Sequence, residues 1–459
     1  MAGIGFELRK IFGKKTLLSR TWGIIYASSV SIGPSLMFLI LLFSIRALML
    51  GYHATEMEIL FFTASFTYAF LIAILISAIM NTVVSRYISD KIFESKEQDI
   101  CACMFGVLTI SSILSGIIAG VLCMMMYLRR DASVEFLVAF YFLTVLAANV
   151  YSLIIFVSAL KEYKKVTGSY FVGVILTVLL FLFLHRVTEL SLISSVFLAL
   201  VGGFFVILLL LTGIAVKAFG APNNQYFGFL TYFKKYPSLF FSGILYMFGF
   251  YLSNIIYWHF SDIRVKVSIF CVAPNYDMAF FLAILVNLSG MVIFEVKTET
   301  SFYEKYIDYL SALGKGTYER IEEKRISLQN TISLQLFFLY EVQLIITIIL
   351  IFLLNIFYPY LGVSNQILNM LLILGMGVYC ILCMYFTIIF LYYFEDYAGA
   401  CVSTGVFFLV VFLGACICSH LGTPYYTIPV LAGGMTGWVI SFIMLRTRVN
   451  NLNAYLLCR

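Results

Sequence analysis

The stretch Lys14–Leu48, KKTLLSRTWGIIYASSVSIGPSLMFLILLFSIRAL, decides the fold class of this chain. It opens with a basic segment that holds Lys14, Lys15 and Arg20, and an apolar run follows from Trp22 onwards. A helical run of about 20 apolar residues is long enough to cross the ~30 Å hydrocarbon core of a bilayer. The stretch therefore predicts a basic flank that leads into a first transmembrane helix.

The composition extends this interpretation to the whole chain. Of its 459 residues, 62% are hydrophobic and only 11% are charged, against about 25% charged residues in an average soluble domain, and the mean hydropathy is +1.01. The apolar runs are continuous, whereas a membrane β-barrel shows alternating segments of about ten residues. Helices satisfy their own backbone hydrogen bonds in lipid. We therefore expect an all-α integral membrane protein without a soluble domain.

Twelve apolar runs are long enough to cross the membrane. They are residues 23–48, 59–80, 100–127, 136–160, 169–185, 192–216, 239–259, 276–296, 333–357, 367–391, 399–419 and 425–445. With both termini in the cytoplasm, the inner loops hold 23 of the 29 Lys and Arg residues, and only six lie outside. Because cytoplasmic loops carry an excess of Lys and Arg, this asymmetry predicts an even number of spans and cytoplasmic N and C termini.

A weak internal repeat divides the twelve spans into two halves. Lys14-Lys15 recurs as Lys234-Lys235, and Gly23–Tyr26 (GIIY) recurs at the same offset of 220 residues as Gly243–Tyr246 (GILY). Both copies stand at the cytoplasmic start of a span, the first and the seventh of the twelve. The repeat therefore predicts two six-helix lobes that share one orientation in the membrane.

The predicted organisation has five parts. They are a cytoplasmic amphipathic segment at 1–22, a first lobe at 23–216, a cytoplasmic linker at 217–238, a second lobe at 239–445 and a cytoplasmic tail at 446–459. The second lobe includes the largest insertion, 297–332, which is expected to form a cytoplasmic helical hairpin. Candidate residues for docking a cytoplasmic partner are Phe6, Arg9, Lys10, Phe302, Tyr306 and Arg320. The hairpin can equally be a plain connector.

The substrate path of a parallel-repeat transporter lies at the interface between its halves. Small and polar residues follow one face of the seventh span, with Asn254 beside it, and two neighbouring faces of the first span, which makes these two spans the candidates for lining the path. The candidates are Tyr26, Ser29, Ser31, Gly33, Pro34, Ser242, Tyr246, Gly249, Ser253, Asn254 and Tyr257. Small residues also allow helices to pack closely, so packing is the alternative role of the same stripe.

Ionisable residues at membrane depth are functional candidates. Glu341 lies eight residues into the predicted ninth span, or ~12 Å along a helix that rises ~1.5 Å per residue, and a carboxylate there can couple transport to protons. Asp277 at the eighth span and Arg46 at the end of the first are the other ion-coupling candidates. The alternative for all three is an interfacial position, with Arg46 reaching the headgroups.

Sequence motifs for catalysis are absent. Gly314–Thr317 (GKGT) lacks the spacing of a phosphate-binding loop, no Asp-x-Asp pair exists to hold a metal and a sugar nucleotide, and no Cys/His cluster has zinc spacing. We therefore expect a protein that is not an enzyme and that carries no metal or cofactor.

The N-terminal sequence Met1–Lys10, MAGIGFELRK, resembles the start of the PelG family, the membrane component of Pel exopolysaccharide export. The segments 276–277, 280–281 and 299–302 also resemble that family. The resemblance implies membership of the multidrug/oligosaccharidyl-lipid/polysaccharide (MOP) exporter superfamily, with two six-helix lobes in a MATE-like arrangement around a central cavity. It further implies a bacterial cytoplasmic (inner) membrane location, a PelF-like cytoplasmic glycosyltransferase and PelD-like and PelE-like membrane proteins as partners, and an N-acetylgalactosamine-rich polymer as cargo.

The function expected from these observations is export of nascent exopolysaccharide across the cytoplasmic membrane by way of an inter-lobe cavity, coupled to a cytoplasmic glycosyltransferase. Two alternatives stay open. One is an ion-coupled exporter of drugs or of lipid-linked oligosaccharides with the same fold. The other is a membrane scaffold that anchors the polysaccharide synthase and transports nothing.

Overall fold

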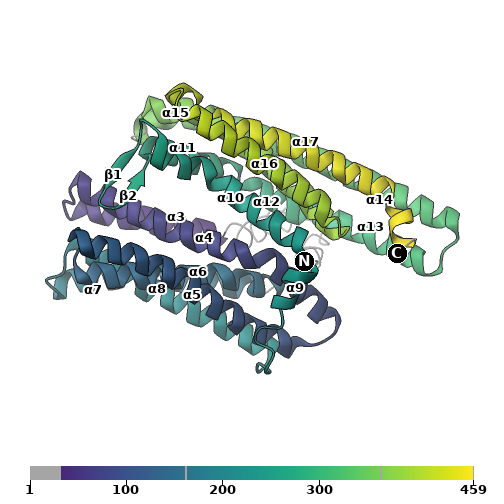
Figure 1. Ribbon diagram of the computed structural model, residues 1–459, viewed down its shortest axis with the longest axis horizontal. Coiled ribbons are helices and arrows are strands. Elements are labelled where there is room, and N and C mark those ends of the chain that lie inside the picture. The colour runs from purple at the N-terminus through teal and green to yellow at the C-terminus, as the bar shows by residue number, and fades with distance from the viewer. Residues whose placement is uncertain (1–32, 161–162, 362–363, 458–459) are drawn as a thin grey trace, which may run out of the picture. The chain divides into compact units, whose positions relative to one another are not determined.

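The computed structural model describes residues 33–160, 163–361 and 364–457, and these residues are helical almost throughout (Figure 1). Their contacts divide the described chain into two compact units. Unit 1 comprises residues 33–244 and 265–272, and unit 2 comprises residues 245–264 and 273–457. The helix α10 (Pro237–Phe260) therefore begins in unit 1 and continues in unit 2.

Unit 1 is a bundle of long helices. Its elements are α3 (Gly33–Gly51), α4 (Glu56–Phe93), α5 (Glu97–Arg129), α6 (Val134–Ala159), α7 (Tyr163–Val187), α8 (Leu192–Phe219), the short α9 (Leu230–Lys235), the start of α10, and the hairpin of β1 (Val265–Val267) and β2 (Phe270–Val272). The helix α6 packs against α4, α5 and α8, while α7 packs against α8 and α3. The helix α6 thus lies at the centre of this bundle.

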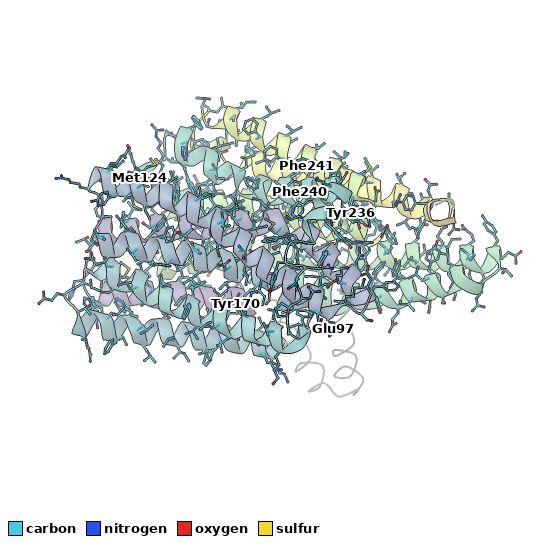
Figure 2. All side chains as sticks on the ribbon, turned by 60° about the horizontal axis from the view of Figure 1, so that its bottom comes forward. Glu97, Met124, Tyr170, Tyr236, Phe240 and Phe241 are labelled. Atoms are coloured by element: carbon cyan, nitrogen blue, oxygen red, sulfur yellow. The ribbon has the colours of Figure 1, made fainter. Side chains whose placement is uncertain are left out.

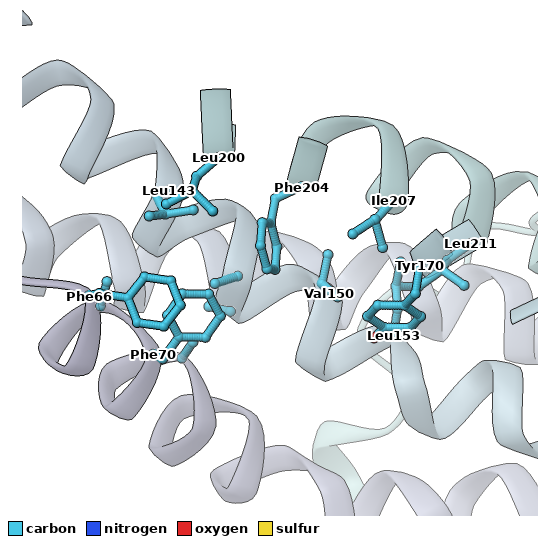
Figure 3. Close-up of a cluster of buried hydrophobic side chains, with 14 of the residues drawn as sticks. Phe66, Phe70, Leu143, Val150, Leu153, Tyr170, Leu200, Phe204, Ile207 and Leu211 are labelled. Atoms are coloured by element: carbon cyan, nitrogen blue, oxygen red, sulfur yellow. The ribbon is translucent and has the colours of Figure 1, made fainter. Parts of the chain in front are cut away.

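The core of unit 1 is built from aromatic and branched side chains (Figure 3). Phe66 and Phe70 of α4 have ring centroids 4.2 Å apart, and the Phe70 ring lies 5.4 Å from that of Phe204 on α8. Leu143 of α6 is fully buried in the same cluster. Aromatic pairs at these distances add to the stabilisation that burial of their area supplies.

Unit 2 is a second bundle. Its elements are the rest of α10, α11 (Pro274–Asn287), α12 (Ser289–Ile293), a π-helical turn at Phe294–Glu299, α13 (Thr300–Lys315), α14 (Tyr318–Leu361), α15 (Asn365–Tyr393), α16 (Tyr397–Cys418), a 3-10 turn at Thr423–Tyr425, α17 (Ile428–Asn450) and α18 (Leu452–Leu457). The helix α15 packs against α11, α14 and α17, and α17 also packs against α16. The helix α15 is the central helix of unit 2.

The outer faces of the helices are apolar and their inner faces carry small polar groups. On α5 the exposed residues Ile113, Ile117, Val121, Met124 and Leu128 form one helical stripe, from which Met124 is labelled in Figure 2. The buried face of the same helix instead holds serines such as Ser111 and Ser115, whose hydroxyls are hydrogen-bonded. An apolar exterior over a hydrogen-bonded interior is the arrangement that lipid requires.

Eleven helices of the described residues are long and apolar enough to cross a membrane, and they coincide with the second to twelfth predicted spans. The predicted all-α membrane fold is therefore confirmed. The described part of the predicted first span is α3. The helix α14 has 44 residues, so at ~1.5 Å per residue it is ~66 Å long and exceeds a ~30 Å hydrocarbon core. Its charged first turns pack against α13, so residues 300–332 form a helical hairpin.

Candidate functional site

A hydrogen-bonded carboxylate stands out in unit 2, in the first turn of α11. Asp277 accepts hydrogen bonds from the side-chain amide of Asn254 at 2.8 Å, from the indole N–H of Trp258 at 2.9 Å to each carboxylate oxygen, and from the backbone N–H of Ala273 at 3.0 Å. Asn254 and Trp258 lie four residues apart on α10, so they point from the same face of that helix. Pro274 begins α11 and places Asp277 at the helix N-terminus, where a negative charge is stabilised.

All three donors to Asp277 are neutral. Among the residues that the structure describes, no Lys, Arg or His forms an ion pair with this carboxylate. The side chain of Asn254 is only 5% exposed, and its carbonyl oxygen has no hydrogen-bond partner. An ionised carboxylate in a poorly solvated site is costly without a compensating positive charge. The arrangement can therefore take up a proton or a small cation.

A tyrosine cluster holds the elements around this carboxylate in place. The Tyr276 hydroxyl donates to Ser253 Oγ at 2.9 Å, and the Tyr257 hydroxyl donates to the backbone carbonyl of Tyr426 at 2.9 Å. The Tyr257 ring lies 4.9 Å from that of Tyr276 and 4.6 Å from that of Tyr426, and all three tyrosines are fully buried. The Tyr426 hydroxyl in turn donates to Asp262. These bonds fix α10 to α11 and to the segment before α17.

The predicted stripe on α10 divides into two parts. Ser253, Asn254 and Tyr257 belong to the polar network around Asp277. A Cβ atom at Gly249 would lie 2.7 Å from the Phe407 ring, and the Tyr246 ring lies 5.4 Å from that of Tyr385. This middle part of the stripe serves helix packing. Ser242, near the start of α10, is buried and donates to the Leu239 carbonyl of its own helix.

The other candidates stand apart from this network. Tyr26, Ser29 and Ser31, like the docking candidates Phe6, Arg9 and Lys10, lie outside the described residues. Gly33 and Pro34 form the start of α3. Glu341 on α14 and Arg46 on α3 are both exposed, and neither is a hydrogen-bond partner of Asp277.

Unit 2 contains a second buried polar cluster, which we did not predict from the sequence. Asn287 of α11 donates to the Gly375 carbonyl at 3.0 Å and accepts from Thr347 at 2.9 Å, while Ser289 donates to Gln343 at 2.8 Å. Asn287, Gln343 and Thr347 are at most 1% exposed. The amides of Asn287 and Gln343 inside apolar runs were the available signal. The cluster ties α11 to α14 and α15.

The hairpin of α13 and the start of α14 has one buried face and one exposed face. Phe302 of α13 is fully buried, with its ring 4.8 Å from Phe390 and 5.0 Å from Tyr393, and Tyr306 stacks on it. Arg320 on α14 is exposed. The opposite face of α13 exposes Tyr303, Ile307 and Leu310, which are 39%, 45% and 40% accessible. The Tyr309 hydroxyl donates to Asn453 at 2.8 Å, and burial raises the pKa of Tyr309 to about 12.

The predicted linker is anchored firmly in unit 1. Asn223 donates to Asp99, which also pairs with Lys91 at 3.3 Å. The Tyr232 hydroxyl donates to Asp90 at 3.1 Å, and burial, reinforced by the Asp90 charge, raises the pKa of Tyr232 to about 12. The aromatic side chains continue through Tyr236, Phe240 and Phe241 into the start of α10 (Figure 2). The linker is therefore a packed part of unit 1.

Solved structures show which known fold this chain shares. An outward-facing multidrug resistance MATE family transporter of the MOP superfamily matches with a TM-score of 0.62 and 12% sequence identity over 94% of this chain and 96% of that chain. A MOP superfamily transporter from Pyrococcus furiosus gives 0.61 and 13% over 94% and 96%, and the bent form of the Vibrio cholerae MATE transporter VcmN gives 0.60 and 13% over 98% and 99%. The fold is that of a MATE-like transporter of the MOP superfamily.

The family follows from the sequence over nearly its whole length. The model of the PelG family, described as "Putative exopolysaccharide Exporter (EPS-E)", matches residues 1–456. This chain belongs to the PelG family. No curated protein sequence gives a significant match.

Proposed function

We propose that this chain exports nascent Pel-type exopolysaccharide, an N-acetylgalactosamine-rich polymer, across the bacterial cytoplasmic membrane. The observation that carries the proposal is the match of residues 1–456 to an exopolysaccharide exporter family in a chain that has the fold of a membrane transporter. The polymer passes through a cavity between the two lobes, which open alternately to either side.

Asp277 supplies the ion coupling in this proposal. A carboxylate with three neutral donors takes up a proton or a small cation, and the unpartnered carbonyl oxygen of Asn254 is available as a second ligand. Uptake of a proton or cation neutralises the Asp277 carboxylate and weakens the hydrogen bonds that it accepts from Trp258 and Ala273. Glu341, which lies on the exposed face of α14, is a less suitable site because it has no comparable set of donors.

The hairpin of α13 and the start of α14 supplies the contact with the polymerising enzyme. Tyr303, Ile307 and Leu310 form an exposed apolar face on α13, at the cytoplasmic side, where a PelF-like glycosyltransferase works. Phe302 and Tyr306 support this face from within and do not reach a partner. PelD-like and PelE-like membrane proteins complete the proposed assembly, and the exposed apolar helix faces of this chain are available for contact with them within the membrane.

Drug export is a second candidate function, because solved structures with this fold include a multidrug resistance transporter. Two assays in cells separate the candidates. A strain that lacks this gene is expected to stop secreting polymer and to recover when the gene is returned. A host that lacks its drug transporters is expected to gain no resistance from it. Restored resistance without polymer secretion would contradict the proposal and support drug export.

A further inference from the structure

The β1–β2 hairpin packs within unit 1, but the chain on both sides of it belongs to unit 2. Residues 265–272 fall in unit 1, whereas the residues on either side, up to Arg264 and from Ala273 onwards, fall in unit 2. The strands pair antiparallel, with Val265 opposite Val272 and Val267 opposite Phe270. The chain therefore leaves unit 2 after α10, forms a hairpin within unit 1, and returns to unit 2 at α11.

The hairpin is seated in an aromatic socket of unit 1. Phe270 is fully buried, and its ring centroid lies 4.8 Å from Tyr68, 5.7 Å from Phe140 and 6.3 Å from Phe61. The Tyr68 hydroxyl donates to the carbonyl of Cys271 at 2.9 Å and accepts from the N–H of Cys271 at 3.3 Å. A single side chain of α4 thus satisfies both backbone groups of one residue on the strand.

The turn of the hairpin adds a polar contact. Ser268 donates from its hydroxyl to Asp131 Oδ2 at 2.9 Å. Ser268 also has a φ of 57°, in the left-handed region that is unusual for a residue other than glycine. An isolated two-stranded hairpin is marginally stable in water. The hairpin therefore depends on its socket for its conformation.

The connections from the hairpin to unit 2 are short. Only Ala273 separates β2 from α11, and one residue spans at most ~3.6 Å. The N–H of Ala273 is bonded to Asp277. On the other side, Ser261–Arg264 join α10 to β1, and Arg264 donates back to the carbonyl of His259. The distance between the end of β2 and the start of α11 can therefore change very little.

We infer that the β1–β2 hairpin is a clasp, which must leave the socket formed by Tyr68, Phe61 and Phe140 once in each transport cycle. The inference rests on the proposed transport function, because transport by this fold requires the two units to change position relative to each other. Because only Ala273 joins β2 to α11, a displacement of α11 away from unit 1 by more than ~3.6 Å requires Phe270 to withdraw from the socket. The bond from Ala273 to Asp277 places the candidate ion site at the joint of the clasp.

A disulfide across the turn tests the clasp directly. The double variant Asp131→Cys with Ser268→Cys joins the two side chains that are in contact in the docked hairpin. Oxidation of this variant is expected to stop polymer secretion, and reduction is expected to restore it. The matched control is Ser133→Cys with Ser194→Cys, whose hydroxyls lie 3.2 Å apart and which joins α6 to α8 without involving the hairpin. Oxidised control protein is expected to continue export.

Unchanged secretion by fully crosslinked Asp131→Cys/Ser268→Cys protein would overturn the inference and make the hairpin a permanent anchor. A second measurement does not depend on export. Labelling of the native Cys271 thiol by a membrane-impermeant maleimide is followed by mass spectrometry in membrane vesicles. Tyr68→Phe removes two hydrogen bonds and is expected to raise the labelling rate about tenfold, whereas Tyr141→Phe on α6 is expected to leave it unchanged. Equal rates for the two variants would also overturn the clasp.

The two measurements separate the clasp from the proposed function. If Cys271 labelling responds to Tyr68→Phe but cells with the native chain secrete no polymer, the clasp stands and the proposed cargo is wrong. If the native chain secretes polymer but labelling and crosslinking have no effect, the cargo stands and the clasp is wrong.

Discussion

At the scale of single residues, two kinds of position matter most for this chain. One is the carboxylate of Asp277, whose donors Asn254, Trp258 and Ala273 are all neutral. The other is the small residue at a close approach, where a methyl group has no room. Substitution of Asp277 is expected to change transport, whereas substitution of a closely packed glycine such as Gly106 is expected to change the stability of the fold.

Asp277→Asn keeps the shape of the side chain and removes its charge. We expect polymer secretion to fall by at least about tenfold, the effect of ~1.4 kcal/mol on the rate-limiting step, while the amount of folded protein in the membrane stays unchanged. Trp258→Phe removes one donor to the carboxylate and is expected to give an intermediate loss. Both are checked by quantifying secreted polymer against the membrane level of the protein. Secretion by Asp277→Asn at the native rate would exclude ion coupling at this position.

Gly106→Ala is expected to destabilise unit 1 without touching the candidate ion site. A Cβ atom at Gly106 would collide with the backbone carbonyl of Tyr226 in the linker, and overpacking of this kind costs ~1–3 kcal/mol. Gly120→Ala on the same helix is the matched control, because the nearest atom to its Cβ belongs to Tyr141 at 3.9 Å. Thermal unfolding in detergent should show a lower midpoint for Gly106→Ala alone. Equal unfolding midpoints for Gly106→Ala and Gly120→Ala would show that the backbone at Tyr226 can move to make room for the added methyl group.

At the scale of elements, the hairpin of α13 and α14 separates a structural face from a free one. Phe302 packs on Phe390 and Tyr393, whereas Tyr303, Ile307 and Leu310 are exposed. Ile307→Glu combined with Leu310→Glu should therefore leave the fold intact and abolish co-purification with the glycosyltransferase. Ser311→Glu is the control, since Ser311 is exposed on the same helix and this substitution adds a negative charge at a polar position. Co-purification that survives the double variant would remove α13 as the docking surface.

The membrane-spanning helices were predictable from the sequence, because the bilayer alone requires long apolar helices. Continuous apolar runs gave the eleven described spans because a helix is the solution that buries backbone polar groups in a bilayer. The continuity of α14 from Tyr318 to Leu361 was not predictable in the same way, since its charged first turns and its apolar remainder look like separate segments. The hairpin at 265–272 is too short to give a periodic signal, and the residues of its socket, Phe61, Tyr68 and Phe140, are distant from it in the sequence.

The candidate site was predictable in part. Ser253 and Tyr257 share one face of a helix, which a period of 3.6 residues reveals, Asn254 lies beside that face, and Asp277 is a carboxylate at the edge of an apolar run. The role of Trp258 was missed because a tryptophan in an apolar run has the same pattern whether its N–H meets lipid or a carboxylate. Which helix faces which partner depends on rotation and register in the bundle, and one sequence does not specify these.

At the scale of the whole molecule, the two bundles and the family match lead to one central claim, that this chain moves a polymer across the membrane. The described helices present apolar faces outward in both units. The chain passes from one unit to the other within α10 and at each end of the β1–β2 hairpin. If the units move relative to each other during transport, the chain must adjust at these places. Crosslinking or labelling at these positions does not require knowledge of the cargo.

The most direct test is transport by the purified full-length chain in liposomes. The PelF-like glycosyltransferase and its sugar donor are supplied on the side that corresponds to the cytoplasm, and a glycoside hydrolase is then added to that side. Polymer is expected to accumulate on the far side, protected from the hydrolase, and this protection is expected to be lost with Asp277→Asn. Polymer that is synthesised but remains fully accessible to the hydrolase would contradict export by this chain and identify it as a scaffold for the synthase.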